Sequence, residues 1–330
     1  VRSSATAEEL AEASFAGQQD TYLYIYGEEE LINYIKECWA SLWTARAIYY
    51  REEKDFNHFK VALSAVVQKM VNSEKSGVVF TANPINNKRD ELMINSSWGL
   101  GEAVVSGVVT PDEYVVDKNN FDIKEKNIAQ KLKMIVKKEK DKIGTELVNV
   151  IDYLGEDKIN ESSLSDDEIY ELVRMAVKIE DMYNKPQDIE WGFDVDTKEL
   201  YILQSRPITT LKEEKEDMAQ DKDEQELNTL VRGLSASPGI ARGKVILIED
   251  MNEIAQVKEG DILVTAMTNP DMVPAMRRAA AVVTDEGGRT CHAAIVSREL
   301  GIPCIVGAGK KKKKLADDIF VTVDATRGVV

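Results

Sequence analysis

The sequence has no run of 18 or more apolar residues, and its first ten residues, VRSSATAEEL, contain no apolar stretch. The first absence excludes a membrane-spanning helix, and the second argues against a secretory leader. Cysteine is scarce: only Cys38, Cys291 and Cys304 occur, and they show neither CxxC nor metal-ligand spacing. Such sparse thiols are typical of a reducing compartment, so we predict a cytoplasmic protein with no membrane partner.

Positive charge is also in deficit, because 58 acidic residues outnumber 42 Lys and Arg and give a formal net charge of −16. Nucleic-acid binding needs clustered Lys and Arg to neutralise phosphates, so we expect no nucleic-acid partner. Two Lys-rich runs, at residues 131–142 and 310–314, lie beside acidic or helix-like sequence and are interpreted as solvated faces. An initiating Met is missing too, and we expect a piece of a longer polypeptide.

The 330 residues are 43% hydrophobic and 30% charged, which favours a soluble globular protein of two domains or three. Apolar residues at helical spacing predict a long amphipathic helix over 28–56 and a second over 165–183. Ser165 and Glu168 have the spacing of a capping box at the start of the second helix. Short β-like runs and two closing strands complete this half, at residues 61–71, 77–82, 92–97, 103–109, 114–117, 188–194 and 199–206.

The composition then changes at residues 212–226, which read KEEKEDMAQDKDEQE and contain one large apolar residue, Met218. We predict a tether over 212–229, with a solvent-exposed helix as the alternative. It separates a domain at 1–211 from one at 230–330. The second domain is Gly-rich, with helices predicted at 270–278 and 290–300 and strands at 239–248, 261–265, 280–284, 304–306 and 320–324.

Residues 188–206 read as an antiparallel hairpin centred on Thr197. Glu190 then lies opposite Gln204 and Asp188 opposite Arg206, and the period of two places all four on one polar face. Oxygen donors of this kind suit Mg²⁺ bound to nucleotide phosphates, and an arginine suits the phosphate itself. An ordinary amphipathic hairpin with a cross-strand Asp–Arg pair explains the pattern equally well. The other face is predicted to be the core side, with Ile189, Trp191, Phe193, Tyr201 and Leu203.

Only two histidines occur. His58 lies between a predicted helix and a strand and is interpreted as a surface or packing residue. His292 follows a Gly-Gly turn and stands in the first turn of a predicted helix, where the positive helix end favours a neutral, nucleophilic imidazole. Backbone N–H groups there, with Arg289 and Thr290, are suited to hold a phosphoryl group on the ring. A helix-cap histidine without chemistry is the alternative.

Several long stretches resemble the phosphoenolpyruvate synthases of the PEP-utilising enzyme family. GGRTCHAAIVSRELGIPCIVG at residues 287–307, and SASPG at 235–239 followed by ARG at 241–243, are similar to the swivelling phosphohistidine domain of that family. VRSSATAEEL with SFAGQ at residues 14–18, GVVFTANP at 77–84, SWGLGEAVVSG at 97–107 and the hairpin are similar to its ATP-grasp half. The resemblance covers nearly the whole chain.

This resemblance implies an α/β (α+β) fold, in which a partial ATP-grasp domain is followed by a β/β/α swivelling phosphohistidine domain. It also implies a reaction: His292 takes the β-phosphoryl group of ATP, AMP and phosphate are released, and the histidine passes the phosphoryl group to pyruvate. The family's first ATP-grasp subdomain would precede Val1, and its pyruvate-binding barrel would follow Val330. The chain is therefore expected to be incomplete as an enzyme.

Carried over onto the matching positions, the resemblance assigns roles to individual residues. His292 is the phosphoacceptor. Glu190 and Gln204 ligate Mg²⁺, with Asp188 beside them. Arg2 and Arg206 hold the phosphates of ATP. A short segment lines the adenine pocket, namely Gln68, Lys69, Met70 and Val71.

Three alternatives remain open. Pyruvate phosphate dikinase shares the architecture but typically has Ser before the histidine, and rifampin phosphotransferase usually has a Ser-His-Gly context. Cys291 and Ala293 therefore favour the synthase. A non-catalytic phosphocarrier or assembly module is the third alternative, and homo-oligomerisation is left undecided.

Overall fold

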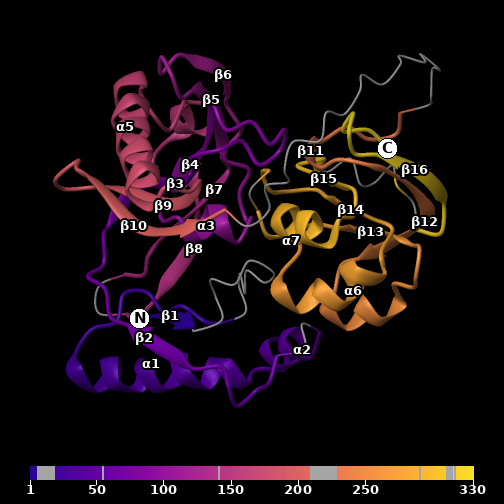
Figure 1. Cartoon of the computed structure of the whole chain (residues 1–330), viewed down its shortest axis with the longest axis horizontal. Coiled ribbons are helices and arrows are strands. Elements are labelled where there is room, and N and C mark those ends of the chain that lie inside the picture. Colours follow the sequence, from indigo (N-terminus) through magenta and orange to yellow (C-terminus); the bar gives the residue numbers. More distant parts are fainter. Residues whose placement is uncertain are drawn as a thin grey trace. The chain divides into compact units, whose positions relative to one another are not determined.

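The computed structural model describes residues 1–5, 19–53, 56–139, 142–208, 229–289, 291–309, 315 and 317–330. Within them the chain contains both helices and strands (Figure 1), which confirms the predicted α/β (α+β) class. Contacts divide the chain into two compact units, residues 1–79, 96–103 and 130–209 in the first and residues 80–95, 104–129 and 210–330 in the second. The predicted tether lies outside the described residues apart from Thr229, and the predicted domain boundaries stay a prediction.

One six-stranded sheet has the order β10-β9-β3-β4-β5-β6. Its strands are β3 (Ser73–Phe80), β4 (Glu91–Trp98), β5 (Asp112–Asp117), β6 (Ile123–Asn127), β9 (Gln187–Asp194) and β10 (Leu200–Pro207). The central strand β4 is buried along its whole length, as expected for a strand covered on both faces. Helix α5 (Asp166–Tyr183) begins with the predicted capping box, in which Ser165 and Glu168 bond each other's backbone N–H groups.

The prediction of one continuous helix over residues 28–56 is wrong. Helix α1 (Glu28–Ala40) passes into a 3₁₀ turn, Ser41–Trp43, and helix α2 (Ala45–Glu53) starts only after Thr44, whose backbone is extended. Ser41 donates to the Cys38 carbonyl at 2.7 Å and Thr44 donates to the Ser41 carbonyl at 3.0 Å. Such local side-chain bonds compete with the helical ladder and end the first helix here.

The strand predicted over residues 103–109 is also wrong, because this segment begins with a short helix, α3 (Glu102–Val105). Ala103 and Val104 are both buried while Val105 is exposed, a pattern that does not alternate. Gly107 follows with φ +78°, a conformation that only glycine adopts easily. The strand predicted over 61–71 is shorter in the structure, β2 (Leu63–Val66), and it pairs with β1 (Arg2–Ala5).

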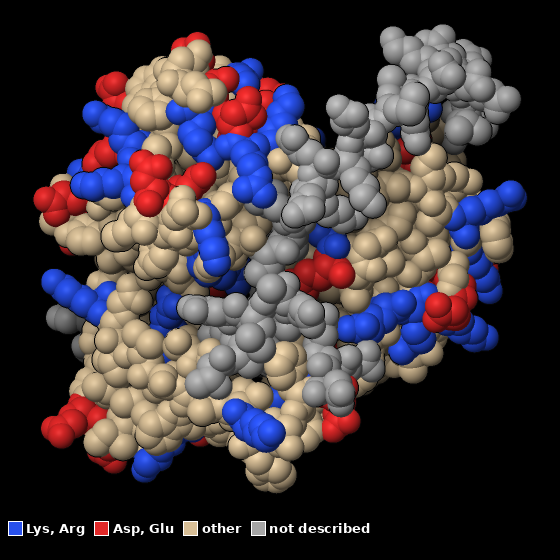
Figure 2. Space-filling view, viewed as in Figure 1, with Lys and Arg blue, Asp and Glu red and all other residues tan. Residues whose placement is uncertain are grey.

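The Lys-rich run at residues 131–142 is only in part the solvated face that was predicted, with Lys133 and Lys142 exposed. It contains strand β7 (Lys133–Lys137), which pairs antiparallel with β8 (Thr145–Asn149), and its centre, Met134 to Val136, is buried. Lys131 is buried as well, and its backbone N–H donates to the carbonyl of Ile159. The second run, at 310–314, lies outside the described residues. Figure 2 shows acidic and basic side chains interspersed over the described part of the face in view.

The second unit contains a six-stranded sheet of order β11-β15-β14-β13-β12-β16. Its inner strands, from β12 to β15, pair in parallel, and both outer strands are antiparallel. The strands are β11 (Leu234–Ser237), β12 (Ile240–Ile248), β13 (Ile262–Thr265), β14 (Ala281–Thr284), β15 (Cys304–Val306) and β16 (Phe320–Asp324). Helices α6 (Val273–Arg278) and α7 (His292–Leu300) follow β13 and β14 in the chain.

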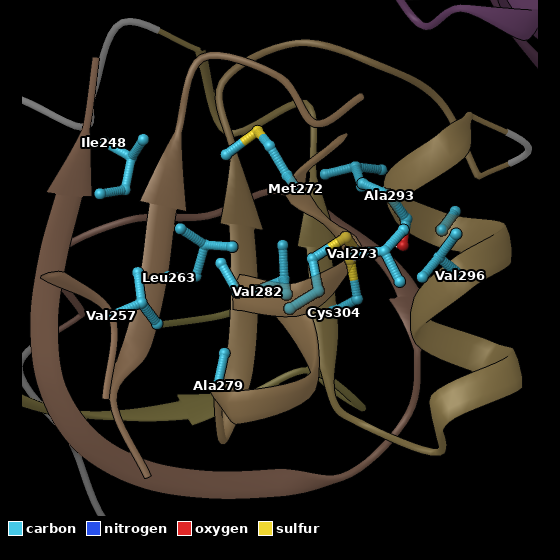
Figure 3. Packing of buried hydrophobic residues seen from close by; sticks show 14 of the residues in the cluster. Ile248, Val257, Leu263, Met272, Val273, Ala279, Val282, Ala293, Val296 and Cys304 are labelled. Carbon is cyan, nitrogen blue, oxygen red and sulfur yellow. Dashed lines mark hydrogen bonds between the residues drawn. The ribbon is translucent and has the colours of Figure 1, made fainter. Parts of the chain in front are cut away.

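Each face of this second sheet has its own apolar cluster. Alternate residues of β12 separate between them, with Ile246 and Ile248 in the cluster that α6 and α7 complete and Val245 in the opposite one. Figure 3 shows the first cluster, in which Met272 and Ala293 lie over the strand residues. The sheet is thus a packed core from which the loops after β13 and β14 emerge.

Candidate functional site

Strands β9 and β10 form the hairpin that the sequence predicted. Gln204 pairs with Glu190 and Arg206 with Asp188, the two cross-strand pairs expected from the pattern. The four polar side chains therefore share one face of the hairpin, because strand side chains alternate with period two. Sequence reasoning placed this half of the hairpin correctly.

A β-bulge interrupts the ladder between Ile202 and Gln204, so that Leu203 has no partner on β9. Beyond the bulge the pairing shifts by one residue, and Tyr201 lies opposite Gly192 instead of on the core side. Tyr201 is 38% exposed, whereas Trp191 is fully buried. The prediction of Tyr201 as a core residue is therefore wrong, and the extra residue is the reason.

The bulge leaves the carbonyl of Leu203 available to two predicted site residues. Arg2 Nη1 donates to it at 3.5 Å and Gln68 Nε2 at 3.1 Å. Pairing of β1 with β2 places Arg2 opposite Val66, two residues before Gln68. Residues far apart in the sequence, from positions 2, 68 and 203, thus meet at one edge of the hairpin.

Arg206 and Asp188 form the charged pair of this site. Both Nε and Nη2 of Arg206 lie 2.8 Å from Asp188 Oδ2. The Asp188 side chain is 11% exposed and that of Arg206 is 29% exposed, so the pair is largely shielded from solvent. An arginine held in this way is oriented before any ligand arrives.

The remaining predicted nucleotide residues follow β2 in the chain. Gln68 and Lys69 are exposed, whereas Met70 and Val71 are half-buried. Among the described residues no three His, Cys, Asp or Glu side chains lie close enough to hold a metal ion. Glu190 and Gln204 would therefore hold Mg²⁺ only together with water or phosphate oxygens, its usual further ligands.

His292 is the first residue of α7, after Cys291 at the cap position. Its Nδ1 lies 2.9 Å from the Thr268 hydroxyl. Its Nε2 is buried and has no hydrogen-bond partner among the described residues, although the residue as a whole is partly exposed. Burial lowers the pKa of His292 to about 4, so the ring is neutral at neutral pH. Neutrality was predicted from the helix end, but loss of solvent is the main cause.

Two arginines fix the loop in front of His292. Arg298 Nη1 donates to the carbonyls of Ala236 and Arg289, at 2.7 and 2.9 Å. Arg289 Nε donates to the carbonyl of Ser235 at 3.1 Å, and its Nη1 lies 2.5 Å from Glu113 Oε1. A role for Arg289 in holding a phosphoryl group stays a prediction, and Thr290 lies outside the described residues.

Sequence reasoning missed Thr268 and Glu113. Thr268 follows β13 and the His292 loop follows β14, and these neighbouring strands are parallel, so both loops emerge at one sheet edge. A prediction that β13 and β14 are parallel neighbours would have indicated that Thr268 lies near the His292 loop. His58 behaves as predicted, since its ring is bonded by Arg51 Nε at 3.0 Å and by Glu52.

Comparison with known proteins identifies two family matches along the chain. Residues 1–227 match "Pyruvate phosphate dikinase, AMP/ATP-binding domain", and residues 257–328 match "PEP-utilising enzyme, mobile domain". The first match covers the hairpin site and the second covers His292. None of the described helices is long and apolar enough to cross a membrane.

Curated relatives align with the whole chain. The phosphoenolpyruvate synthase of Pyrococcus furiosus is 62% identical over 331 residues, which are 40% of that protein. A probable phosphoenolpyruvate synthase of Archaeoglobus fulgidus is 54% identical, over 43% of its length. The phosphoenolpyruvate synthase of Aeropyrum pernix is 45% identical, again over 43% of its length. The chain spans about two-fifths of the length of these relatives.

Proposed function

This chain belongs to the pyruvate phosphate dikinase AMP/ATP-binding domain family, and from that premise we propose that it moves a phosphoryl group from ATP to His292. The observation that carries the proposal is the state of this imidazole. It is neutral, one nitrogen is bonded to Thr268, and the other is without a partner among the described residues. A nucleophile needs this combination: a fixed orientation and a free lone pair.

Thr268 determines which nitrogen reacts. If Nδ1 carries the proton and donates it to the Thr268 hydroxyl, the lone pair lies on Nε2. Nε2 attacks the β-phosphorus of ATP, the bond to the α-phosphate oxygen breaks, and AMP leaves. Water then removes the outer phosphate, and a single phosphoryl group remains on His292.

The hairpin site is proposed to hold ATP. Arg206 and Arg2 bind the phosphates, and residues 68–71 contact the adenine. Glu190 and Gln204, paired across the ladder, present oxygen donors of the kind that Mg²⁺ prefers. When bound there, the ion would neutralise charge on the phosphate oxygens, while the arginine fork orients them for displacement.

The acceptor is proposed to be pyruvate, which would yield phosphoenolpyruvate. This step rests on the relatives, which are named phosphoenolpyruvate synthase and are more than twice as long as the chain. A pyruvate site in the part of those proteins that the chain does not cover is therefore included in the proposal. A cytoplasmic location fits a reaction that consumes ATP.

Labelled ATP tests the proposal on the polypeptide that carries this chain. With label at the β-position, the protein should acquire acid-labile, base-stable label, whereas label at the γ-position should appear as free phosphate. His292→Gln should abolish labelling, and the matched control His58→Gln should retain it. Full labelling of the His292→Gln variant would refute the assignment. Release of AMP only when pyruvate is added would show that the acceptor is required earlier than proposed.

A further inference from the structure

Residues 68–71, the segment proposed to contact the adenine, are anchored at both ends. At the first end Gln68 Nε2 donates to the carbonyl of Leu203, in the bulge of the hairpin, at 3.1 Å. Beyond the other end, the backbone carbonyl of Asn72 accepts from the Val195 N–H at 2.8 Å. The segment therefore spans two points of the β9–β10 hairpin, which also carries the proposed phosphate site.

The backbone between these anchors is free to meet a ligand. Lys69, Met70 and Val71 make no backbone hydrogen bond to any residue that the structure describes. Their N–H and C=O groups can therefore bond the edge of a base. Bonds of this kind gain affinity when the groups are already held in the bound position, because less freedom is lost on binding. The anchors of this segment thus bear on the affinity for the base.

A side chain from a third segment fixes the second anchor. The Tyr24 hydroxyl donates to Asn72 Oδ1 at 2.8 Å, although the two residues are 48 positions apart in the sequence. Tyr24 is 6% exposed, and burial raises the pKa of its hydroxyl, so the group is a neutral donor at neutral pH. Asn72 is therefore bonded twice, through its carbonyl to the hairpin and through its side chain to Tyr24.

Tyr24 is held in a backbone conformation that side chains rarely allow. Its φ is +51°, in the left-handed region. Lys137 Nζ lies 5.6 Å from the centre of the Tyr24 ring and 5.0 Å from that of Tyr26, a cation–π contact with both. Strained residues persist where the surrounding contacts over-determine them, and they gather at ligand-binding sites. The strain, the lysine contact and the hydroxyl bond together indicate more than packing.

We propose that Tyr24 is a positioning residue for the nucleotide base: its hydroxyl holds Asn72, and Asn72 sets the position of residues 68–71. This inference rests on the proposed function, because it assumes that ATP binds at the hairpin. Within that site Arg2 and Arg206 act on the phosphates, whereas Tyr24 acts only where the base binds. Loss of the hydroxyl therefore weakens binding of ATP and leaves binding of a bare polyphosphate unchanged.

Tyr24→Phe tests the proposal, because it removes the hydroxyl and keeps the ring that Lys137 contacts. Calorimetric titration of the polypeptide that carries this chain, with Mg²⁺ present, compares ATP with inorganic tripolyphosphate. The dissociation constant for ATP should rise about five- to tenfold, and that for tripolyphosphate should stay within about twofold. Tyr26→Phe is the matched control, since Tyr26 also contacts Lys137 but is 45% exposed, and both constants should stay unchanged.

A double-mutant cycle tests whether Tyr24 acts through Asn72. Asn72→Ala removes the acceptor and keeps the backbone carbonyl that bonds Val195. It should raise the dissociation constant for ATP by a factor similar to that of Tyr24→Phe. The double variant should bind ATP within about twofold of the weaker single variant, because both changes remove the same bond. Melting temperatures of all four proteins check that each is folded at the temperature of the titration.

Three results would overturn the proposal. If Arg206→Gln binds ATP weakly while Tyr24→Phe binds it normally, the hydroxyl does not position the base site. Equal losses for ATP and tripolyphosphate in Tyr24→Phe would show a general disturbance of the site. A double variant whose loss is the product of the two single losses would show that Tyr24 acts independently of Asn72. Unchanged ATP affinity in Arg206→Gln would instead count against the proposed function, and this inference would fall with it.

Discussion

At the β9–β10 hairpin the charged groups are bonded to one another, whereas at His292 the ring nitrogen Nε2 has no partner among the described residues. Arg206 holds Asp188, and Arg2 and Gln68 share the Leu203 carbonyl. His292 is bonded on one side by Thr268 and has a buried Nε2 on the other. The side chains of the first site are thus held in place by bonds within the protein, while the second site carries a cost of desolvation that a new bond to Nε2 would relieve.

The largest effect is expected from Arg206→Gln. The substitution removes the guanidinium that is proposed to bind a phosphate and leaves Asp188 mostly buried without its cation. We expect ATP affinity to fall about a hundredfold and the free energy of unfolding to fall by about 2 kcal/mol. Calorimetric titration with ATP and Mg²⁺ measures the first. The exposed Arg174 on α5 supplies the control variant, Arg174→Gln, and equal affinities for both variants would contradict the binding role.

Thr268→Val should affect the other site selectively. Losing the hydroxyl frees Nδ1, so the proton is no longer held away from Nε2. The rate of histidine phosphorylation should fall about 10- to 100-fold, while ATP affinity stays unchanged. Single-turnover labelling measures the rate, and Thr268→Ser should restore it because the hydroxyl returns. A fall in ATP affinity without a change in the phosphorylation rate would contradict a role of Thr268 at His292.

The charge state of His292 offers a smaller but direct test. Its pKa of about 4 lies below the ordinary 6.5, because burial disfavours the imidazolium. As pH falls from about 6.5 to 4, the unfolded chain gains a proton that the folded chain does not, so stability declines over this window and levels off below it. Imidazole NMR, assigned with His58→Gln, should give a midpoint near 4. A midpoint near 6.5 would show a solvated ring.

Tyr201 should show the smallest effect. The bulge turns its side chain to the exposed face, so Tyr201→Ala should lower the free energy of unfolding by less than about 1 kcal/mol. The buried Phe193, which pairs with the adjacent Leu200, provides the contrast, since Phe193→Ala should cost about 3–5 kcal/mol. Urea unfolding of both variants measures the difference. Equal losses would mean that the ladder is continuous in solution.

Much of the fold could be predicted because apolar periodicity reports directly on burial. The register of Gln204 and Arg206 follows from counting residues about a turn, and the cap of α5 follows from Ser165 and Glu168. The break after α1 could not be predicted from periodicity, since it depends on bonds that Ser41 and Thr44 make locally. The apolar stretch 103–105 reads equally as strand or helix.

The candidate sites were predicted where the chemistry lies within one segment. His292 stood out because a Gly-Gly turn leads into a helix. Thr268 and Glu113 did not, because their places beside the histidine loop arise from strand pairing and from a contact between distant segments. Leu203 carried no sign of a bulge, since neither it nor its neighbours is a glycine. Whether Glu190 and Gln204 hold an ion stays a prediction.

The bulge at Leu203 divides β10 into two phases of alternation. The half from Gln204 to Pro207 pairs with Gln187 to Glu190, and the half from Leu200 to Ile202 pairs with Trp191 to Phe193. Loss of Leu203 would make Ile202 and Gln204 consecutive opposite Trp191 and Glu190, so the ladder would become regular, and the carbonyl that accepts from Arg2 and Gln68 would be lost with it.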